Sequence, residues 1–515
     1  MARRVVVIGG GVGGLVAALE LACAGLDVTL LERAATPGGK LREVAVAGRR
    51  LDAGPTVFTM RWVFEEVFAD AGAALSDHLS LRPASILARH AWTAGQQLDL
   101  FADLEESADA IGHFAGAAEA RGFRAFSAEA TRIYATLEKP FIRGGRPSMG
   151  SLLRDAGAVA LWGIRPFDTL WKALSQHFAD PRLRQLFGRY ATYCGSSPFL
   201  APATLMLVAH VERDGVWLVD GGMHGIAQAL AGLAAARGAT LRFGAEAAEV
   251  LLERGRVAGV RLADGERVAA EAVVVNADAG AVAAGLLGTA VRGAAPAVAA
   301  RDRSLSAVTW ATVARSEGFP LSRHNVFFSG DYAAEFRDLA AGRLPQEPTV
   351  YVCAQDRGDD DALLSGPERL LCLVNAPSTG DARPPTPTEI ERCADRSFRL
   401  LARCGLTLWP EATEVTTPAG FHQLFPGTGG ALYGPAVHGA TATFKRPGAR
   451  TRVPGLYLAG GSTHPGAGVP MAALSGRLAA ASLLADLDTK IGEKTAWTST
   501  ARSPAAATPG GTSMR

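Results

Sequence analysis

The sequence has few cysteines, and their arrangement gives no metal site or disulfide framework. Its 515 residues include six cysteines, none in a C-x-x-C pair and none beside a pair of histidines. Zinc sites and disulfide scaffolds depend on such spacing. We therefore interpret the cysteines as buried or free thiols in a reducing compartment, and we expect no bound metal.

Excess charge and long apolar runs are also missing. The formal net charge is only +2, which provides no bulk attraction for nucleic acid. No segment reaches the roughly 18 uninterrupted apolar residues of a membrane span, so we predict no transmembrane helix and leave contact with a membrane surface open. The run from Val5 to Leu19 follows two arginines like a signal peptide, but its glycines favour another role.

Length and composition indicate a folded protein of more than one domain. Hydrophobic residues make up 48% and charged residues 20% of the chain, which is typical of a packed globular protein. The length exceeds the roughly 250–300 residues that a single core usually serves.

The N-terminus carries a dinucleotide-binding pattern. A strand-like run, Val5–Ile8, is followed by a glycine turn, an Ala/Leu-rich helix and a second strand that ends on Glu32. In a G-x-G-x-x-G turn the first glycine allows the sharp bend, the second lets the backbone approach a pyrophosphate, and the third lets the helix pack on the strand. Glu32 lies where a carboxylate accepts hydrogen bonds from a ribose hydroxyl. The glycines expected at this site are Gly9, Gly11, Gly13 and Gly14.

The α/β pattern stops after the first segment and resumes further along the chain. Strand-like and helical patterns return from about residue 217, so we predict a discontinuous nucleotide-binding domain with other segments inserted into it. The predicted domain comprises residues 1–57, 217–285 and 450–488, the substrate and membrane-contact domain comprises residues 58–216 and 286–449, and a disordered tail comprises residues 489–515.

An apolar segment in the first insertion has two interpretations. Residues 156–164 are apolar and residues 165–172 add basic side chains. Such a segment can lie on a bilayer surface, or it can be a core helix. The sequence leaves both open.

Only one convincing G-x-G-x-x-G unit is present. Enzymes that pass electrons from NAD(P)H to a flavin usually carry two such units, whereas the later glycine clusters at 221–225 and 427–430 lack the spacing. One site therefore serves one dinucleotide, and the motif alone does not decide between FAD and NAD.

Four blocks of the sequence resemble the bacterial-type phytoene desaturases and related carotenoid oxidoreductases of the FAD-dependent amine-oxidase-like superfamily. These blocks are the N-terminal fingerprint through Gly38-Gly39-Lys40, Asp52–Pro55, Tyr193–Pro198 and Gly455–Val469. Within that family, three middle segments are most similar to the hydroxyneurosporene (1-hydroxycarotenoid 3,4-) desaturases of purple bacteria: His324–Tyr332, Pro348–Arg357 and Ala431–Pro435.

The resemblance implies a fold, a cofactor and its contacts. The fold would be α/β, with a discontinuous Rossmann-like FAD-binding domain and a mixed α+β substrate domain inserted. FAD would lie on the glycine fingerprint and on the ribose contact Glu32, and the helix after Met471 would direct its N-terminus at the flavin. Lys40 replaces the arginine common in the family, which puts its phosphate contact in doubt. The further contacts implied are Gly39, Lys40, Val250, Gly460, Gly461, Val469 and Met471.

No catalytic residue follows from the resemblance. His464 lies beside the implied flavin position and is a weak candidate, and a structural turn residue is the alternative interpretation. No catalytic base is assigned.

The implied activity is the desaturation of an acyclic C40 carotenoid, as C3–C4 dehydrogenation of 1-hydroxyneurosporene-type or 1-methoxy substrates. A hydride would pass to the flavin, and a proton would leave the neighbouring carbon. The enzyme would be cytoplasmic and peripherally attached to the inner or photosynthetic membrane, with a quinone or oxygen as electron acceptor, no metal and no nucleic-acid partner. The alternatives are a phytoene desaturase, a non-oxidative carotenoid isomerase, and a non-enzymatic relative of the Rab GDP-dissociation inhibitors.

Overall fold

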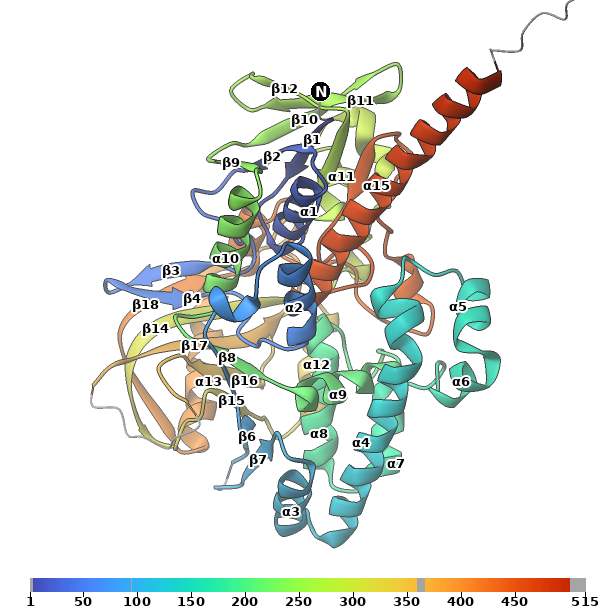
Figure 1. Cartoon of the computed structure of the whole chain (residues 1–515). Coiled ribbons are helices and arrows are strands. Elements are labelled where there is room, and N and C mark those ends of the chain that lie inside the picture. Colours follow the sequence, from blue (N-terminus) through green and yellow to red (C-terminus); the bar gives the residue numbers. More distant parts are fainter. Residues whose placement is uncertain (1–2, 94, 359–365, 501–515) are drawn as a thin grey trace, which may run out of the picture.

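A parallel five-stranded sheet forms one half of the computed structural model, which describes residues 3–93, 95–358 and 366–500 (Figure 1). Its strands lie in the order β19-β13-β1-β2-β9, and all four pairings are parallel. The bounds are β1 (Arg4–Ile8), β2 (Asp27–Glu32), β9 (Thr240–Phe243), β13 (Ala272–Val275) and β19 (Leu456–Leu458). Three separated parts of the sequence thus build one sheet, in keeping with the predicted fold class.

Residues of β1 alternate between two hydrophobic cores. Val5 and Val7 belong to the core on the side of helix α1 (Val12–Cys23), whereas Val6 and Ile8 belong to a core on the opposite face. This is the two-residue alternation of a buried strand. The second core lies under a small antiparallel sheet and a short helix: β10 (Ala247–Glu253), β11 (Arg256–Leu262), β12 (Arg267–Ala269) and α11 (Ala279–Ala284).

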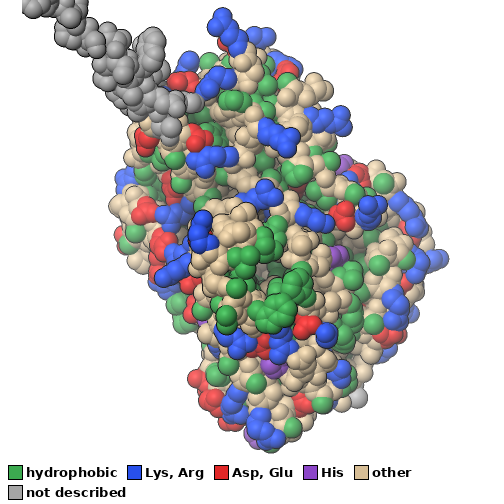
Figure 2. Space-filling view, turned by 90° about the vertical axis from the view of Figure 1, so that its right-hand side faces the viewer, with side chains coloured by type: hydrophobic (Ala, Val, Ile, Leu, Met, Phe, Trp, Pro, Cys, Tyr) green, Lys and Arg blue, Asp and Glu red, His purple; other side chains and the backbone are tan. Residues whose placement is uncertain are grey.

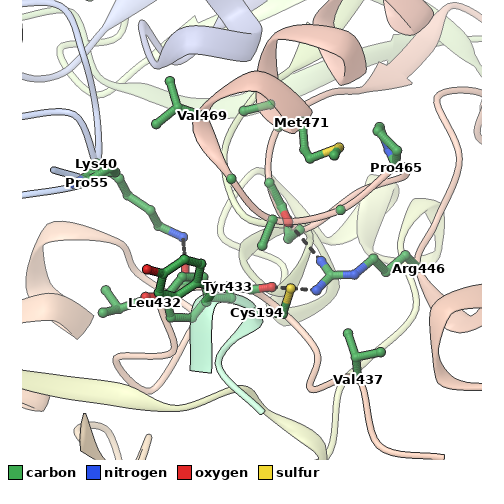
Figure 3. Close-up of a pocket in the computed structure, with 18 of the residues that line it drawn as sticks. Lys40, Pro55, Cys194, Leu432, Tyr433, Val437, Arg446, Pro465, Val469 and Met471 are labelled. Atoms are coloured by element: carbon green, nitrogen blue, oxygen red, sulfur yellow. Dashed lines mark hydrogen bonds between the residues drawn. The ribbon is translucent and has the colours of Figure 1, made fainter. Parts of the chain in front are cut away.

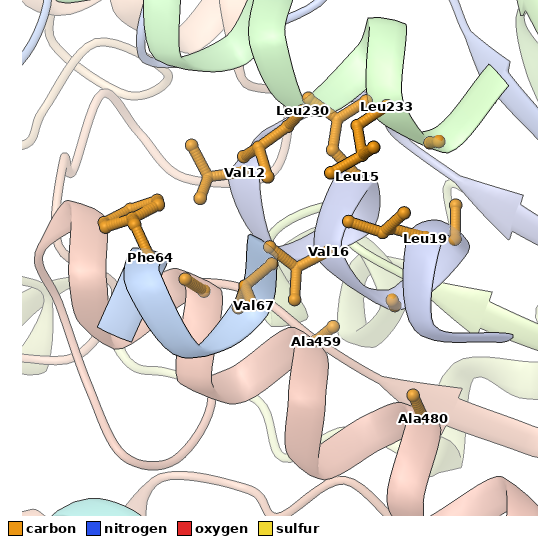
Figure 4. Close-up of a cluster of buried hydrophobic side chains, with 14 of the residues drawn as sticks. Val12, Leu15, Val16, Leu19, Phe64, Val67, Leu230, Leu233, Ala459 and Ala480 are labelled. Carbon is orange, nitrogen blue, oxygen red and sulfur yellow. The ribbon is translucent and has the colours of Figure 1, made fainter. Parts of the chain in front are cut away.

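Helix α1 is buried along almost its whole length because three helices surround it. These are α2 (Arg61–Asp70), α10 (His224–Ala236) and α15 (Val469–Thr500). In Figure 4 the side chain of Val67 from α2 lies beside Val16 of α1, and Phe64 of α2 belongs to the same core. Helix α2 therefore packs with the nucleotide-binding half, although its residues fall within the segment predicted to be inserted.

A seven-stranded mixed sheet forms the second half. The order is β18-β14-β17-β16-β15-β6-β7, and the bounds are β6 (Ile86–Ala91), β7 (Gln97–Phe101), β14 (Ser306–Gly318), β15 (His324–Phe327), β16 (Val350–Ala354), β17 (Glu368–Ala376) and β18 (Leu406–Thr416). Strand β6 pairs in parallel with β15. Both inserted segments thus contribute to one sheet.

Helices of the inserted segments extend from this sheet (Figure 1). They are α3 (Leu104–Ala115), α4 (Ala117–Leu137), α5 (Met149–Ala156), α6 (Ala158–Gly163), α7 (Leu170–His177), α8 (Pro181–Gly188), α9 (Leu207–Asp214), α12 (Tyr332–Ala340), α13 (Pro387–Arg403) and α14 (Pro418–Leu424). Two small pairs of strands complete the chain: β3 (Glu43–Val46) with β4 (Arg49–Asp52), and β5 (Leu81–Pro83) with β8 (Trp217–Val219).

The C-terminal helix extends beyond its predicted end. The sequence predicted a disordered tail from residue 489, whereas α15 continues to Thr500. Lys, Glu and Ala, which are favourable in helices, occur among the residues after 489. Residues 501–515 of the predicted tail lie outside the described residues.

The structure also bears on the absences noted in the sequence. All six cysteines are free thiols, and four of them are buried. Among the described residues no group of three or more His, Cys, Asp or Glu side chains is placed to hold a metal ion. Within the same ranges no helix has both the length and the apolar character needed to cross a bilayer.

Candidate functional site

A cavity of about 1120 Å³ runs between the two halves of the molecule. One part is lined by the N-terminal glycine turn and by the start of α15, and the other by apolar side chains of the inserted helices and of the seven-stranded sheet. Ligand pockets usually measure roughly 300–1,000 Å³. The cavity therefore lies just above the upper end of this range.

The glycine turn connects β1 to α1 through contacts that exclude a side chain. Gly9 has a φ of +99°, and a Cβ on Gly14 would lie 2.0 Å from the Gly9 carbonyl oxygen. Gly14 thus permits the close helix–strand packing that the sequence predicted, without lining the cavity itself. Gly9, Gly11 and Gly13 do line it.

A second glycine loop lies against the first. The Gly38 amide donates a hydrogen bond to the Gly10 carbonyl oxygen at 2.8 Å. Gly39 has a φ of +58°, and a Cβ there would lie 3.2 Å from the Cα of Gly11. The two loops together form a cradle of bare backbone, which suits a pyrophosphate.

The carboxylate of Glu32 is fixed at the edge of this cradle. It is buried and accepts hydrogen bonds from the Gly10 amide at 2.6 Å and the Ala34 amide at 2.7 Å. Each bond occupies a different carboxylate oxygen, so both oxygens retain acceptor capacity. Glu32 lines the cavity, and its position fits the ribose contact that the sequence predicted.

Lys40 has contacts that the sequence did not predict. Its ammonium donates a hydrogen bond to the Leu432 carbonyl oxygen at 2.7 Å and lies 5.4 Å from the centre of the Phe425 ring (Figure 3). Burial lowers the pKa of Lys40, and the nearby Asp278 opposes that shift. These contacts of Lys40 connect the loop of residues 425–433 to the cradle.

The start of α15 closes the cofactor end of the cavity. The predicted residues Gly460, Gly461, Val469 and Met471 all line it (Figure 3). A Cβ on Gly13 would lie 2.7 Å from the carbonyl oxygen of Ala472. The first and last parts of the chain therefore meet in one site, where the partial positive charge of a helix N-terminus faces the cavity.

Val250 was predicted to contact the cofactor, and the structure places it elsewhere. It is buried in the core between the small antiparallel sheet and the parallel sheet, and its amide donates to the Leu287 carbonyl oxygen at 2.9 Å. The strand reaches the cavity at its beginning instead, through Glu246 and Ala247. The predicted contact lies a few residues too far along the strand, because the sequence of an apolar strand does not show which of its ends meets a ligand.

His464 does not line the cavity either. Its ring lies edge-on to Phe141, and its Nε2 is 3.0 Å from the Gly144 carbonyl oxygen. Burial lowers its pKa. Its contacts attach the 462–466 turn to the inserted helices, so the structure favours the turn interpretation over a role in proton transfer.

Three polar residues that the sequence did not predict line the cofactor end. The Asn276 side-chain amide donates to the Gly9 carbonyl oxygen at 3.1 Å, and Asp278 caps α11. Arg446 is fully buried and donates to the carbonyl oxygens of Gly461 at 2.8 Å, Tyr433 at 2.8 Å and Pro435 at 2.9 Å. Within the described part of the chain these hydrogen bonds all go to backbone carbonyls, and the guanidinium places a positive charge near the start of α15 (Figure 3).

Exposed apolar residues line the other end of the cavity. Met149 and Leu153 of α5 and Trp162 of α6 are 51%, 44% and 75% exposed, and Phe167 is 76% exposed. Figure 2 looks onto this face and shows hydrophobic side chains gathered near its middle, with Lys and Arg side chains around them. We call Met149, Leu153, Val159, Trp162 and Phe167 the apolar rim. Residues 156–164 are largely exposed, so the core-helix interpretation is wrong.

Comparisons with known proteins match nearly the whole chain. The family model described as flavin containing amine oxidoreductase matches residues 12–484. A hydroxyneurosporene desaturase of Rubrivivax gelatinosus is 56% identical over 99% of this chain and 98% of its own length. One of Cereibacter sphaeroides is 47% identical over 94% of this chain and 98% of its own length. A solved oxidoreductase of Methanosarcina mazei has a TM-score of 0.58 at 17% identity, over 92% of this chain and 99% of that one.

Proposed function

Because the chain belongs to the flavin-containing amine oxidoreductase family, we propose that it is an FAD-dependent desaturase of an acyclic, hydroxylated carotenoid. The resemblance predicted from four sequence blocks is confirmed at the level of the family. The identity to hydroxyneurosporene desaturases supports hydroxyneurosporene as the substrate, and we propose C3–C4 as the bond.

The observation that carries the proposal is the continuity of one cavity. A dinucleotide cradle of glycine backbone and a ribose-binding carboxylate lead directly into a space walled by apolar side chains, which reaches an exposed apolar rim. The residues present fit FAD: Gly9, Gly11 and Gly39 leave room for the pyrophosphate and Glu32 for the ribose. When bound, FAD supplies the two-electron acceptor for the dehydrogenation.

The chain itself contributes position and exclusion of water. A polyene delocalises developing positive charge, so alignment of the carbon chain beside the cofactor is the main requirement. Leu205, Val208 and Leu371 belong to the apolar wall. Arg446 and the N-terminus of α15 hold positive charge at the cofactor end, where negative charge develops on reduction.

The apolar rim is the proposed contact with a membrane. A C40 carotenoid is dissolved in the bilayer, and four of the five rim residues, all but Val159, line the same cavity that would receive it. Arg146, Arg154 and Lys172 lie in or beside the segments that carry the rim, and basic side chains favour anionic lipid surfaces. We propose peripheral attachment at the inner or photosynthetic membrane, with the substrate entering through the rim.

A quinone or oxygen is the proposed electron acceptor. The described residues contain one parallel sheet with one glycine fingerprint, which serves one dinucleotide. A membrane quinone would be reachable from a bilayer-bound protein.

A direct test of the cofactor and its reduction uses the purified protein. It should be yellow and release FAD on denaturation. Anaerobic mixing with hydroxyneurosporene in detergent micelles should remove the absorbance of the oxidised flavin, and a quinone should restore it. Protein that binds no flavin, or whose flavin absorbance stays constant with this substrate, contradicts the proposal.

A further inference from the structure

A polar cluster interrupts the apolar wall of the cavity on the inserted half. Arg189 and Tyr193 belong to a short helix, η3 (Arg189–Cys194), and Glu212 belongs to α9. Arg189 donates to the Tyr193 hydroxyl at 2.6 Å, and that hydroxyl donates to Glu212 at 2.9 Å. All three line the cavity, and Arg189 and Glu212 are only 5% and 3% exposed. A buried charged pair in apolar surroundings is costly to fold.

The cluster carries donors that the described residues do not satisfy. Nε and Nη2 of Arg189 have no hydrogen-bond partner there, and neither has the hydroxyl of Tyr332, which is 6% exposed and also lines the cavity. Nη2 lies 3.8 Å from the Glu212 carboxylate, beyond hydrogen-bonding distance. Buried polar groups in folded proteins are nearly always paired. These groups therefore point to a ligand with a polar atom.

The position of the cluster links it to the reacting end of the substrate. Helix η3 ends at Cys194, and a Cβ on the next residue, Gly195, would lie 2.4 Å from the ring of Tyr433. Figure 3 places Cys194 and Tyr433 beside Arg446, below the start of α15. The same short helix thus spans from the cofactor end of the cavity to Arg189. In a C3–C4 dehydrogenation, a hydroxyl on C1 is only a few bonds from the reacting carbons.

We propose, on the basis of the proposed function, that Arg189 and Tyr332 bind the terminal hydroxyl of the carotenoid and so determine its selection over an unhydroxylated end. The free N–H groups of Arg189 donate to the hydroxyl oxygen, and the Tyr332 oxygen accepts the hydroxyl proton. Tyr193 and Glu212 are positioning residues that hold the guanidinium. Burial raises the pKa of Tyr193, which keeps its phenol protonated as the donor to Glu212.

Selection follows from the cost of leaving these groups unpaired. A substrate without the hydroxyl would bury the arginine donors against hydrocarbon, and sites built to bond a hydroxyl discriminate strongly against analogues that lack it. A methoxy end would still accept from Arg189 but would offer no proton to Tyr332.

The test compares hydroxyneurosporene and neurosporene as substrates of the flavin-loaded protein in the same micelles. The variants are Arg189→Met, which keeps length without charge, Arg189→Lys, and Tyr332→Phe, which removes only a hydroxyl. Tyr457→Phe is the matched control, because its hydroxyl bonds to Asp486 and the residue does not line the cavity. Flavin content reports whether each variant is folded.

We expect Arg189→Met to lower the ratio of kcat/KM values, hydroxylated over unhydroxylated, by about tenfold to a hundredfold. Arg189→Lys should restore part of the ratio, Tyr332→Phe should lower it several-fold, and Tyr457→Phe should leave it unchanged. If kcat/KM falls equally for both substrates, or if the ratio does not change, this inference is overturned and the proposed function still stands. If Arg189→Met fails to retain flavin, Tyr332→Phe decides by the same criterion. Wild-type protein that desaturates neither carotenoid overturns the proposed function with it.

Discussion

Removing two aromatic side chains from the apolar rim should detach the protein from membranes without unfolding it. Trp162 and Phe167 are 75% and 76% exposed, and their rings contact each other at 6.1 Å between centroids. Fully burying a large apolar side chain contributes about 1.5–3 kcal/mol. The pair should therefore contribute about 3 kcal/mol to insertion, and Trp162→Ser with Phe167→Ser should weaken partitioning roughly a hundredfold.

The assay is cosedimentation with vesicles of phosphatidylglycerol and phosphatidylcholine. Trp409→Ser is the matched control, because Trp409 is 47% exposed on β18 and does not line the cavity. The double variant should keep its flavin and its melting temperature, since exposed side chains add little to the core. Its turnover of substrate supplied in vesicles should fall more than its turnover in micelles. If the double variant and the Trp409→Ser control bind the vesicles equally well, the assignment of the rim as the membrane contact is refuted.

Three further predictions concern the cofactor site and the stability of the fold. Glu32→Ala should weaken FAD binding by about 1.5–3 kcal/mol, because the ribose loses a charged acceptor; titration of the apoprotein with FAD measures this, and an unchanged Kd would exclude the contact. Gly14→Ala should destabilise the protein and prevent flavin loading, since its Cβ would lie 2.0 Å from the Gly9 carbonyl oxygen; a wild-type melting temperature would contradict that packing. Burial, reinforced by Arg323 and Arg189, lowers the pKa of His324 from 6.5 to about 3. Because the unfolded chain takes up this proton first, the stability contributed by neutral His324 is complete above pH 6.5 and is lost as the pH falls, by about 2 kcal/mol at pH 5. Chemical denaturation of His324→Gln should show a shallower fall between about pH 7 and 5, and a slope identical to wild type would speak against the assignment.

Where a local pattern fixes the geometry, the structure places the residues as the sequence predicted. The turn at Gly9–Gly14, the acid at Glu32 and the approach of Gly460 depend on short segments whose residue types have few alternatives. The prediction for Val250 named a residue too far along its strand. The alternation of residues in a strand shows which side chains share a face, but it does not show which end of the strand meets a ligand.

Other parts of the site depend on contacts between distant segments. Arg446 bonds to carbonyls of two separate segments, at residues 433–435 and at Gly461, and no motif around it distinguishes it from a surface arginine. The Tyr193–Pro198 block is one of the four that resemble the family, yet its relation to Arg189, Glu212 and Tyr332 appears only when η3, α9 and α12 are packed together. Helix α2 was assigned to the insertion because sequence order does not show which core an amphipathic helix joins.

Product analysis with three carotenoids supplied side by side tests the central claim most directly. The flavin-loaded protein is incubated with a quinone and, in separate reactions, with hydroxyneurosporene, neurosporene or phytoene. The products are separated, and their masses are measured by mass spectrometry. The account predicts that hydroxyneurosporene is converted fastest, with loss of two hydrogen atoms and a red-shifted spectrum. A product of unchanged mass would indicate an isomerase, faster conversion of phytoene would indicate a phytoene desaturase, and either result would contradict the account.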